Sequence, residues 1–107
     1  MTHIVVTKNG EDISSIECSG HTGYAAEGED IVCAAVSSII QTAVLGVLML
    51  AKVDAEVKKG DGYLLVKIPK NLSEDRKRDC NLLLNAAILG VSDIREEYSD
   101  YIELEVK

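Results

Sequence analysis

The sequence predicts a single α+β domain in which a mixed sheet packs on a long, apolar central helix and a second helix. The chain has 107 residues, which suits one domain with a modest core. Short β-branched or alternating segments are separated by two segments of helical periodicity. No linker or low-complexity run interrupts them. Residues 1–107 are therefore expected to form one domain in the order ββαββαβ.

The first half of the chain predicts a hairpin followed by the central helix. Residues 2–8 are apolar and β-branched, and Asn9–Gly10 supplies a tight turn. Residues 13–19 have the composition of the returning strand. A helix is expected from about Glu29 to about Ala51, because this segment is apolar on more than one side and therefore buried.

The next segment predicts a second hairpin. Residues 53–58 and 63–68 have strand composition, and the sequence KGDG lies between them. Pro69 ends the second of these strands, because proline has no N–H to donate.

The last third of the chain predicts a helix and a closing strand. Ser73 is a candidate N-cap, since its hydroxyl can accept a bond from a free amide of the first turn. Gly90 is expected to break the helix, and residues 101–106 alternate as a strand. An apolar stripe at helical spacing predicts the buried face of the helix: Cys80, Leu83, Leu84, Ala87 and Val91.

Composition and charge limit the function. Hydrophobic residues make up 47% of the chain, with no Phe and no Trp, so the core is expected to be aliphatic. The net charge of −7 argues against direct nucleic-acid binding, which needs clustered Lys and Arg. Three cysteines are too few for a disulfide framework, and the N-terminal residues do not resemble a signal peptide. A cytoplasmic location is expected.

The uncharged segment 31–51 is long enough to cross a membrane. Four polar side chains interrupt it: Ser37, Ser38, Gln41 and Thr42. The rest of the chain alternates and turns as a soluble domain does. A buried central helix, with no membrane partner, is therefore the preferred interpretation.

The stretch GHTGYAAEGEDIVCAAVSSI, residues 20–39, contains the candidate chemistry. Cys33 is expected in the first turn of the helix, where free amides and the helix dipole stabilise a thiolate. His21 precedes it on a glycine-rich loop and could serve as its base. Asp30, Ser37 and Gln41 lie three before, four after and eight after Cys33, which gives that face of the helix a polar stripe.

Simpler interpretations of the same residues remain open. Cys33 could be a small core residue and His21 an exposed loop residue. Asp30 could be the helix N-cap. A zinc site would join Cys18, His21 and Cys33, but a second close ligand pair is missing. Cys18 and Cys80 are most simply packing residues, and neither a metal nor another cofactor is expected.

The glycines around His21 predict a substrate-gating loop. Gly20, Gly23 and Gly28 remove steric limits on the backbone, and Tyr24 lies among them. Such a loop would let His21 close over a bound substrate.

These residues together resemble the signature of the ribosomal-processing cysteine protease family (Prp). The matching positions are Gly20, His21, Gly23, Tyr24, Ala25, Gly28, Asp30, Ile31, Val32, Cys33 and Ala34. The resemblance implies a cytosolic cysteine endopeptidase that removes the N-terminal extension of the twenty-seventh protein of the large ribosomal subunit. It assigns the nucleophile to Cys33 and the base to His21, gives Asp30 and Ser37 supporting positions, and implies a homodimer.

A second hypothesis comes from another functional class. A small acidic dimer could act without catalysis, as a binding module or chaperone for a basic ribosomal protein. The polar stripe beside Cys33 favours the enzyme, since a core-facing surface rarely needs polar groups.

Overall fold

The computed structural model describes residues 1–20 and 27–107, with side chains described for 1–20 and 31–107. Its elements confirm the predicted order ββαββαβ. In chain order they are β1 (Thr2–Asn9), β2 (Asp12–Ser19), α1 (Glu27–Met49), β3 (Glu56–Gly60), β4 (Tyr63–Lys67), α2 (Glu74–Glu97) and β5 (Ile102–Val106).

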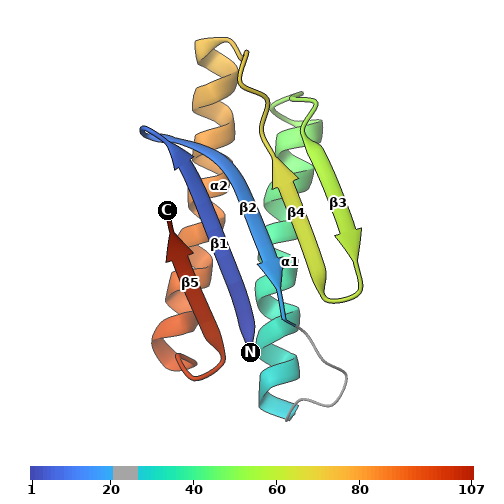
Figure 1. Ribbon diagram of the computed structural model, residues 1–107, viewed down its shortest axis with the longest axis vertical. Coiled ribbons are helices and arrows are strands. Elements are labelled where there is room, and N and C mark those ends of the chain that lie inside the picture. The colour runs from blue at the N-terminus through green and yellow to red at the C-terminus, as the bar shows by residue number, and fades with distance from the viewer. Residues whose placement is uncertain (21–26) are drawn as a thin grey trace.

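The strands form one mixed sheet in the order β3-β4-β2-β1-β5. Strands β1 and β5 are parallel, and the other neighbouring pairs are antiparallel. The parallel pair requires a crossover, which α2 supplies. Both helices cover the same face of the sheet (Figure 1). The predicted fold class, a mixed sheet packed on two helices, is therefore confirmed.

The core lies between this face and the helices. Strand residues alternate, so each strand turns every second side chain toward α1 and α2. The predicted aliphatic character is confirmed: the fully buried side chains of the core include Ile4, Val6, Ile16, Val36, Ile40, Val47, Val66, Leu84 and Val91.

Helix α1 begins at Glu27, two residues before the predicted start. Acidic residues are favourable at a helix N-terminus, and a glycine within a helix costs only about 1 kcal/mol, so Gly28 does not delay the start. Gly28 therefore belongs to the helix and not to the loop. Asp30 is the fourth helical residue, so the N-cap interpretation is wrong. Cys33 lies in the second turn, not in the first as expected.

The end of α1 and the start of β3 also differ from the prediction. Lys52 has a positive φ of 56°, and the amide of Val53 donates to the carbonyl of Val47, which closes the helix. Val53 and Ala55 are buried but precede the strand, which begins at Glu56.

In α2, one prediction is confirmed and one is wrong. The Ser73 hydroxyl accepts a bond from the amide of Arg76 at 3.3 Å, as expected of an N-cap. Gly90 does not break the helix, which continues to Glu97. A Cβ at Gly90 would lie 3.4 Å from Ile39, so this glycine forms part of the contact between the helices. Buried Val91 continues the apolar face beyond it.

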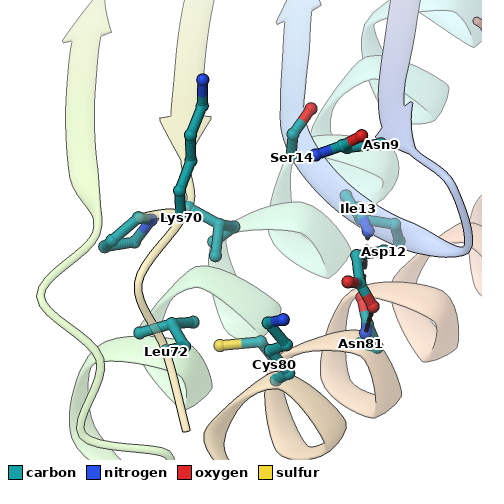
Figure 2. A pocket seen from close by; sticks show the side chains of 11 residues that line it. Asn9, Asp12, Ile13, Ser14, Lys70, Leu72, Cys80 and Asn81 are labelled. Carbon is teal, nitrogen blue, oxygen red and sulfur yellow. Dashed lines mark hydrogen bonds between the residues drawn. The ribbon is translucent and has the colours of Figure 1, made fainter. Parts of the chain in front are cut away.

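Asn81 joins α2 to the β1–β2 hairpin. Its Oδ1 accepts a bond from the amide of Ile13 at 3.0 Å, and its Nδ2 donates to Asp12 Oδ1 at 2.8 Å. Figure 2 shows this pair of bonds beside a small cavity of about 80 Å³. One side chain therefore satisfies a strand amide and holds the hairpin turn against the helix.

We expect Asn81→Ala to lower the free energy of unfolding by about 2 kcal/mol, because the amide of Ile13 loses its partner. Urea denaturation measures the free energy of unfolding of Asn81→Ala and of the control variant Asn85→Ala. Asn85 lies one turn later, is exposed, and its side chain donates to the carbonyl of Asn81 within the same helix. Its loss is therefore expected to lower the free energy of unfolding by less than about 0.5 kcal/mol. Equal effects of the two substitutions would show that the link to the hairpin contributes nothing.

Candidate active site

Cys33 lies on a hollow between α1 and one end of the sheet. The start of β1, the end of β2 and the β3–β4 turn meet there beside the first half of α1 (Figure 1). We call this space, of about 240 Å³, the Cys33 hollow. It is lined by Thr2, Cys18, Ser19, Cys33, Ser37, Gln41, Lys59, Gly60, Tyr63 and Leu64.

The helical wall of the Cys33 hollow is the predicted polar stripe. Cys33, Ser37 and Gln41 recur every four residues and all line the hollow. Gln41 Nε2 donates to Ser37 Oγ at 2.8 Å. Because the Ser37 oxygen accepts this bond, its own hydroxyl proton remains available to a group one turn away, where Cys33 lies.

The three thiols have different environments. Cys33 is half-buried, whereas Cys18 and Cys80 are buried. Burial, and after it the negative charge of a Cys33 thiolate, raise the pKa of Cys18 to about 11. Burial and the charge of Asp79 also raise the pKa of Cys80. Both buried thiols are therefore kept protonated near neutral pH, in agreement with their predicted packing role.

Cys80 also lies far from the Cys33 hollow. It lines the cavity at the Asn81 end of α2, where its sulfur points toward Leu72 (Figure 2). A chemical role for Cys33 therefore does not involve Cys80.

The rim of the Cys33 hollow is formed by the β3–β4 hairpin and is polar. The Tyr63 hydroxyl donates to Glu17 Oε2 at 2.8 Å, and this bond raises the pKa of Tyr63. Lys59 is exposed on the same rim. The floor, by contrast, contains buried Cys18 and Leu64.

The other predicted site residues have mixed outcomes. Ser37 lies beside Cys33 in the hollow, as expected. His21, Gly23 and Tyr24 lie outside the described residues, so the pairing of His21 with Cys33 stays a prediction. The backbone of Asp30 lies in the first turn of α1, and its side chain is outside the described set.

Gly20 has a different role from the loop flexibility assigned to it. Its φ is +102°, and a Cβ there would overlap the carbonyl oxygen of Met1. Glycine is therefore required by a close backbone approach at this position. Among the glycines of the predicted gating loop, Gly20 and Gly28 are described, and neither lies in a free loop.

The zinc interpretation is not resolved by the described residues. In residues 1–20 and 31–107, no three His, Cys, Asp or Glu side chains form a group that could hold a metal ion. The proposed set of Cys18, His21 and Cys33 includes one residue outside these ranges.

Sequence reasoning missed Thr2, Lys59 and Tyr63 as lining residues. Thr2 carried a usable signal, since it alternates with buried Ile4 and Val6 and must therefore face the helices. Lys59 and Tyr63 carried none, because their position depends on the pairing of β4 with β2.

Known proteins are similar to this chain in sequence and in fold. The model of the family described as cysteine protease Prp matches residues 1–103. The ribosomal processing cysteine protease Prp of Bacillus subtilis (strain 168) is 30% identical over 94 residues, which cover 86% of this chain and 84% of that protein.

Two solved structures of the ribosomal processing protease Prp from S. aureus have the same fold over 100% of both chains. One, in complex with a substrate peptide, has a TM-score of 0.87 and 23% identity. The other, with a covalently linked product peptide, has a TM-score of 0.82 and 24% identity. From the family match and the B. subtilis relative, the chain belongs to the Prp family of cysteine proteases.

Proposed function

We propose that this protein is a ribosomal-processing endopeptidase in which Cys33 is the nucleophile and His21 the general base and acid. Its substrate is the precursor of the twenty-seventh protein of the large ribosomal subunit, from which it removes the N-terminal extension. The observation that carries the proposal is that Cys33 is only partly buried and lines a polar hollow, while the other two thiols are buried.

The reaction follows the chemistry of a thiol and an imidazole. His21 takes the proton of Cys33, and the thiolate attacks the carbonyl carbon of the scissile peptide bond. The C–N bond breaks as His21 protonates the departing amine, which leaves a thioester on Cys33. Water, deprotonated by His21, attacks the thioester and releases the carboxylate product together with the Cys33 thiol. These steps need no metal and no other cofactor.

Among the described side chains, Ser37 is a hydrogen-bond donor that could support these steps. The amide of Cys33 lies in the second turn of α1, where helix amides bond to carbonyls four residues earlier. It is therefore not a free oxyanion donor, as a first-turn amide would be. The Ser37 hydroxyl, held by Gln41, can donate either to the thiolate or to the developing oxyanion.

The related proteins and the net charge of this chain support a ribosomal protein precursor as the substrate. The B. subtilis relative is named as a ribosomal processing enzyme, and the S. aureus structures hold a substrate peptide and a covalently linked product peptide. Ribosomal proteins are basic as a class, and a chain with a net charge of −7 attracts basic partners. A cytoplasmic location, where ribosomes assemble, belongs to the same proposal.

Cleavage of a peptide that spans the extension boundary tests the proposal. We expect Cys33→Ala and His21→Ala each to reduce kcat/KM by at least about 1000-fold, because each removes one half of the reacting pair. Cys80→Ala is the matched control and is expected to retain activity within about twofold.

The same experiment separates the enzyme from a non-catalytic binding module. Such a module would bind the peptide equally well with or without the Cys33→Ala substitution and would leave it intact. Cleavage that persists in Cys33→Ala would refute the assignment of the nucleophile.

We further propose that the protein is a homodimer formed through the outer faces of α1 and α2. The segment Ile31–Met49 is long and apolar enough to cross a membrane, but it forms the core helix here, with 39% of the window buried. Much of its remaining apolar surface points away from the sheet. Large exposed side chains on the two helices, and at the residue directly after α1, are Ile31, Leu45, Met49, Leu50, Leu82 and Leu89. A monomer rarely leaves so many exposed together.

A groove between the helices, of about 370 Å³, gives this surface a shape that a second copy could fill. It is lined by Ser38, Ile39, Thr42, Ala43, Gly46, Leu50, Leu83, Ala86 and Ala87. Ala86 is small and exposed in this groove, which leaves room for a side chain of a second copy. Gly46 is buried against Leu83 and serves the contact between α1 and α2.

Sedimentation equilibrium tests the dimer. We expect twice the chain mass of 11.6 kDa at micromolar concentration, and a monomer for Leu89→Glu, which places a charge on the exposed helical face. Val106→Glu adds the same charge at an exposed position of the edge strand β5, outside the two helices, and should leave the dimer intact. A monomeric wild type, or a dimer that tolerates Leu89→Glu, would contradict this surface.

A further inference from the structure

Thr2 is buried beside Cys33 with an unsatisfied hydroxyl. Its side chain is 1% exposed and lines the Cys33 hollow. Among the described residues, its Oγ1 is the one buried side-chain oxygen or nitrogen without a hydrogen-bond partner. A buried hydroxyl without a partner is unfavourable, because it has lost its bonds to water and gained none.

The direction of the Thr2 side chain is set by the sheet. Its amide donates to the carbonyl of Tyr101 at 2.8 Å, and it pairs with Ile102 in the parallel β1–β5 ladder. Ile4 and Val6 follow on the same face and are buried against the helices. Valine has the shape of threonine and would fit this position without an unpaired oxygen. A hydroxyl at this position therefore indicates a hydrogen-bond partner that is bound only part of the time.

The lining of the Cys33 hollow indicates what this partner is. Among the described residues, the polar groups that line the hollow away from its rim are neutral: the hydroxyls of Thr2, Ser19 and Ser37 and the amide of Gln41. Lys59 brings a charge only to the exposed rim. An aliphatic side chain in this space would leave Thr2 unpaired, whereas a neutral side chain with an amide or hydroxyl would pair it.

We propose that Thr2 is a specificity-determining residue: its Oγ1 bonds to an amide- or hydroxyl-bearing substrate side chain seated in the Cys33 hollow. The inference rests on the proposed function, since it takes Cys33 as the residue that attacks the neighbouring peptide bond. A site that hydrogen-bonds its substrate rejects an isostere without that group, because the protein group is then left unpaired.

The experiment compares wild type with Thr2→Val, Thr2→Ser and Thr7→Val. Thr7 lies on the same strand, is only partly buried and does not line the hollow, so its valine variant is the matched control. The probes are peptides that span the extension boundary and carry Asn or its near-isostere Leu at each position flanking the cleaved bond.

Two results are expected. Without peptide, Thr2→Val raises Tm, on the order of 5 °C, because an unpaired buried hydroxyl is removed. At one flanking position, wild type, Thr2→Ser and Thr7→Val prefer Asn over Leu in kcat/KM by about tenfold or more, and Thr2→Val loses this preference. A residue that only packs would not combine higher stability with lost selectivity.

The proposal is overturned if Thr2→Val lowers Tm, or if the Asn-to-Leu ratio is the same in wild type and Thr2→Val. If Thr2→Val does not fold, the Asn-to-Leu ratio in kcat/KM is measured with Thr2→Ala. A packing defect lowers kcat/KM for both peptides alike and so leaves their ratio unchanged. Binding of the same peptides to Cys33→Ala, with and without Thr2→Val, gives the ratio without turnover. Failure of Cys33 as nucleophile is thereby distinguished from failure of the Thr2 subsite.

Discussion

The packing of α1 against the sheet is the constraint on which the rest of the structure depends. Val36, Ile40 and Val47 are almost fully buried, so the rotation of α1 about its own axis is fixed. With that rotation fixed, Cys33 and the polar residues one and two turns later line a hollow at the edge of the core. The same apolar contact that stabilises the fold therefore determines that Cys33 lines this hollow on the helical side.

Much of the fold followed from local patterns in the sequence. Alternation predicted the strands, the Ser73 cap predicted the start of α2, and four-residue spacing predicted that Ser37 and Gln41 accompany Cys33. Such features depend on a few neighbouring residues and so can be inferred from sequence alone. The predictions that Gly28 lies in the loop and that Gly90 breaks α2 were wrong, because the low helix propensity of glycine was overridden. At Gly90 it is overridden by the contact between the two helices.

Features set by distant contacts could not be predicted. The strand order brings Thr2, at the start of β1, to the same hollow as Lys59 and Tyr63 of the β3–β4 hairpin, more than 50 residues later in the chain. Asn81 bonds to a hairpin 68 residues away, and nothing in its helical surroundings indicates this. The unpaired hydroxyl of Thr2 is visible only when the surroundings of the side chain are known. Which polar groups line the site therefore depends on how the strands pair and how the sheet packs against the helices.

The central claim is that the packing of α1 leaves Cys33 as the accessible one of the three thiols, and timed alkylation with iodoacetamide tests it most directly. Digestion and mass mapping follow each cysteine at a pH of about 7.5, below the ordinary thiol pKa. The account predicts that Cys33 is modified at least about tenfold faster than the others, because Cys80 is buried and Cys18, with a pKa of about 11, stays protonated. Equal rates, or modification of Cys18 or Cys80 first, would contradict it.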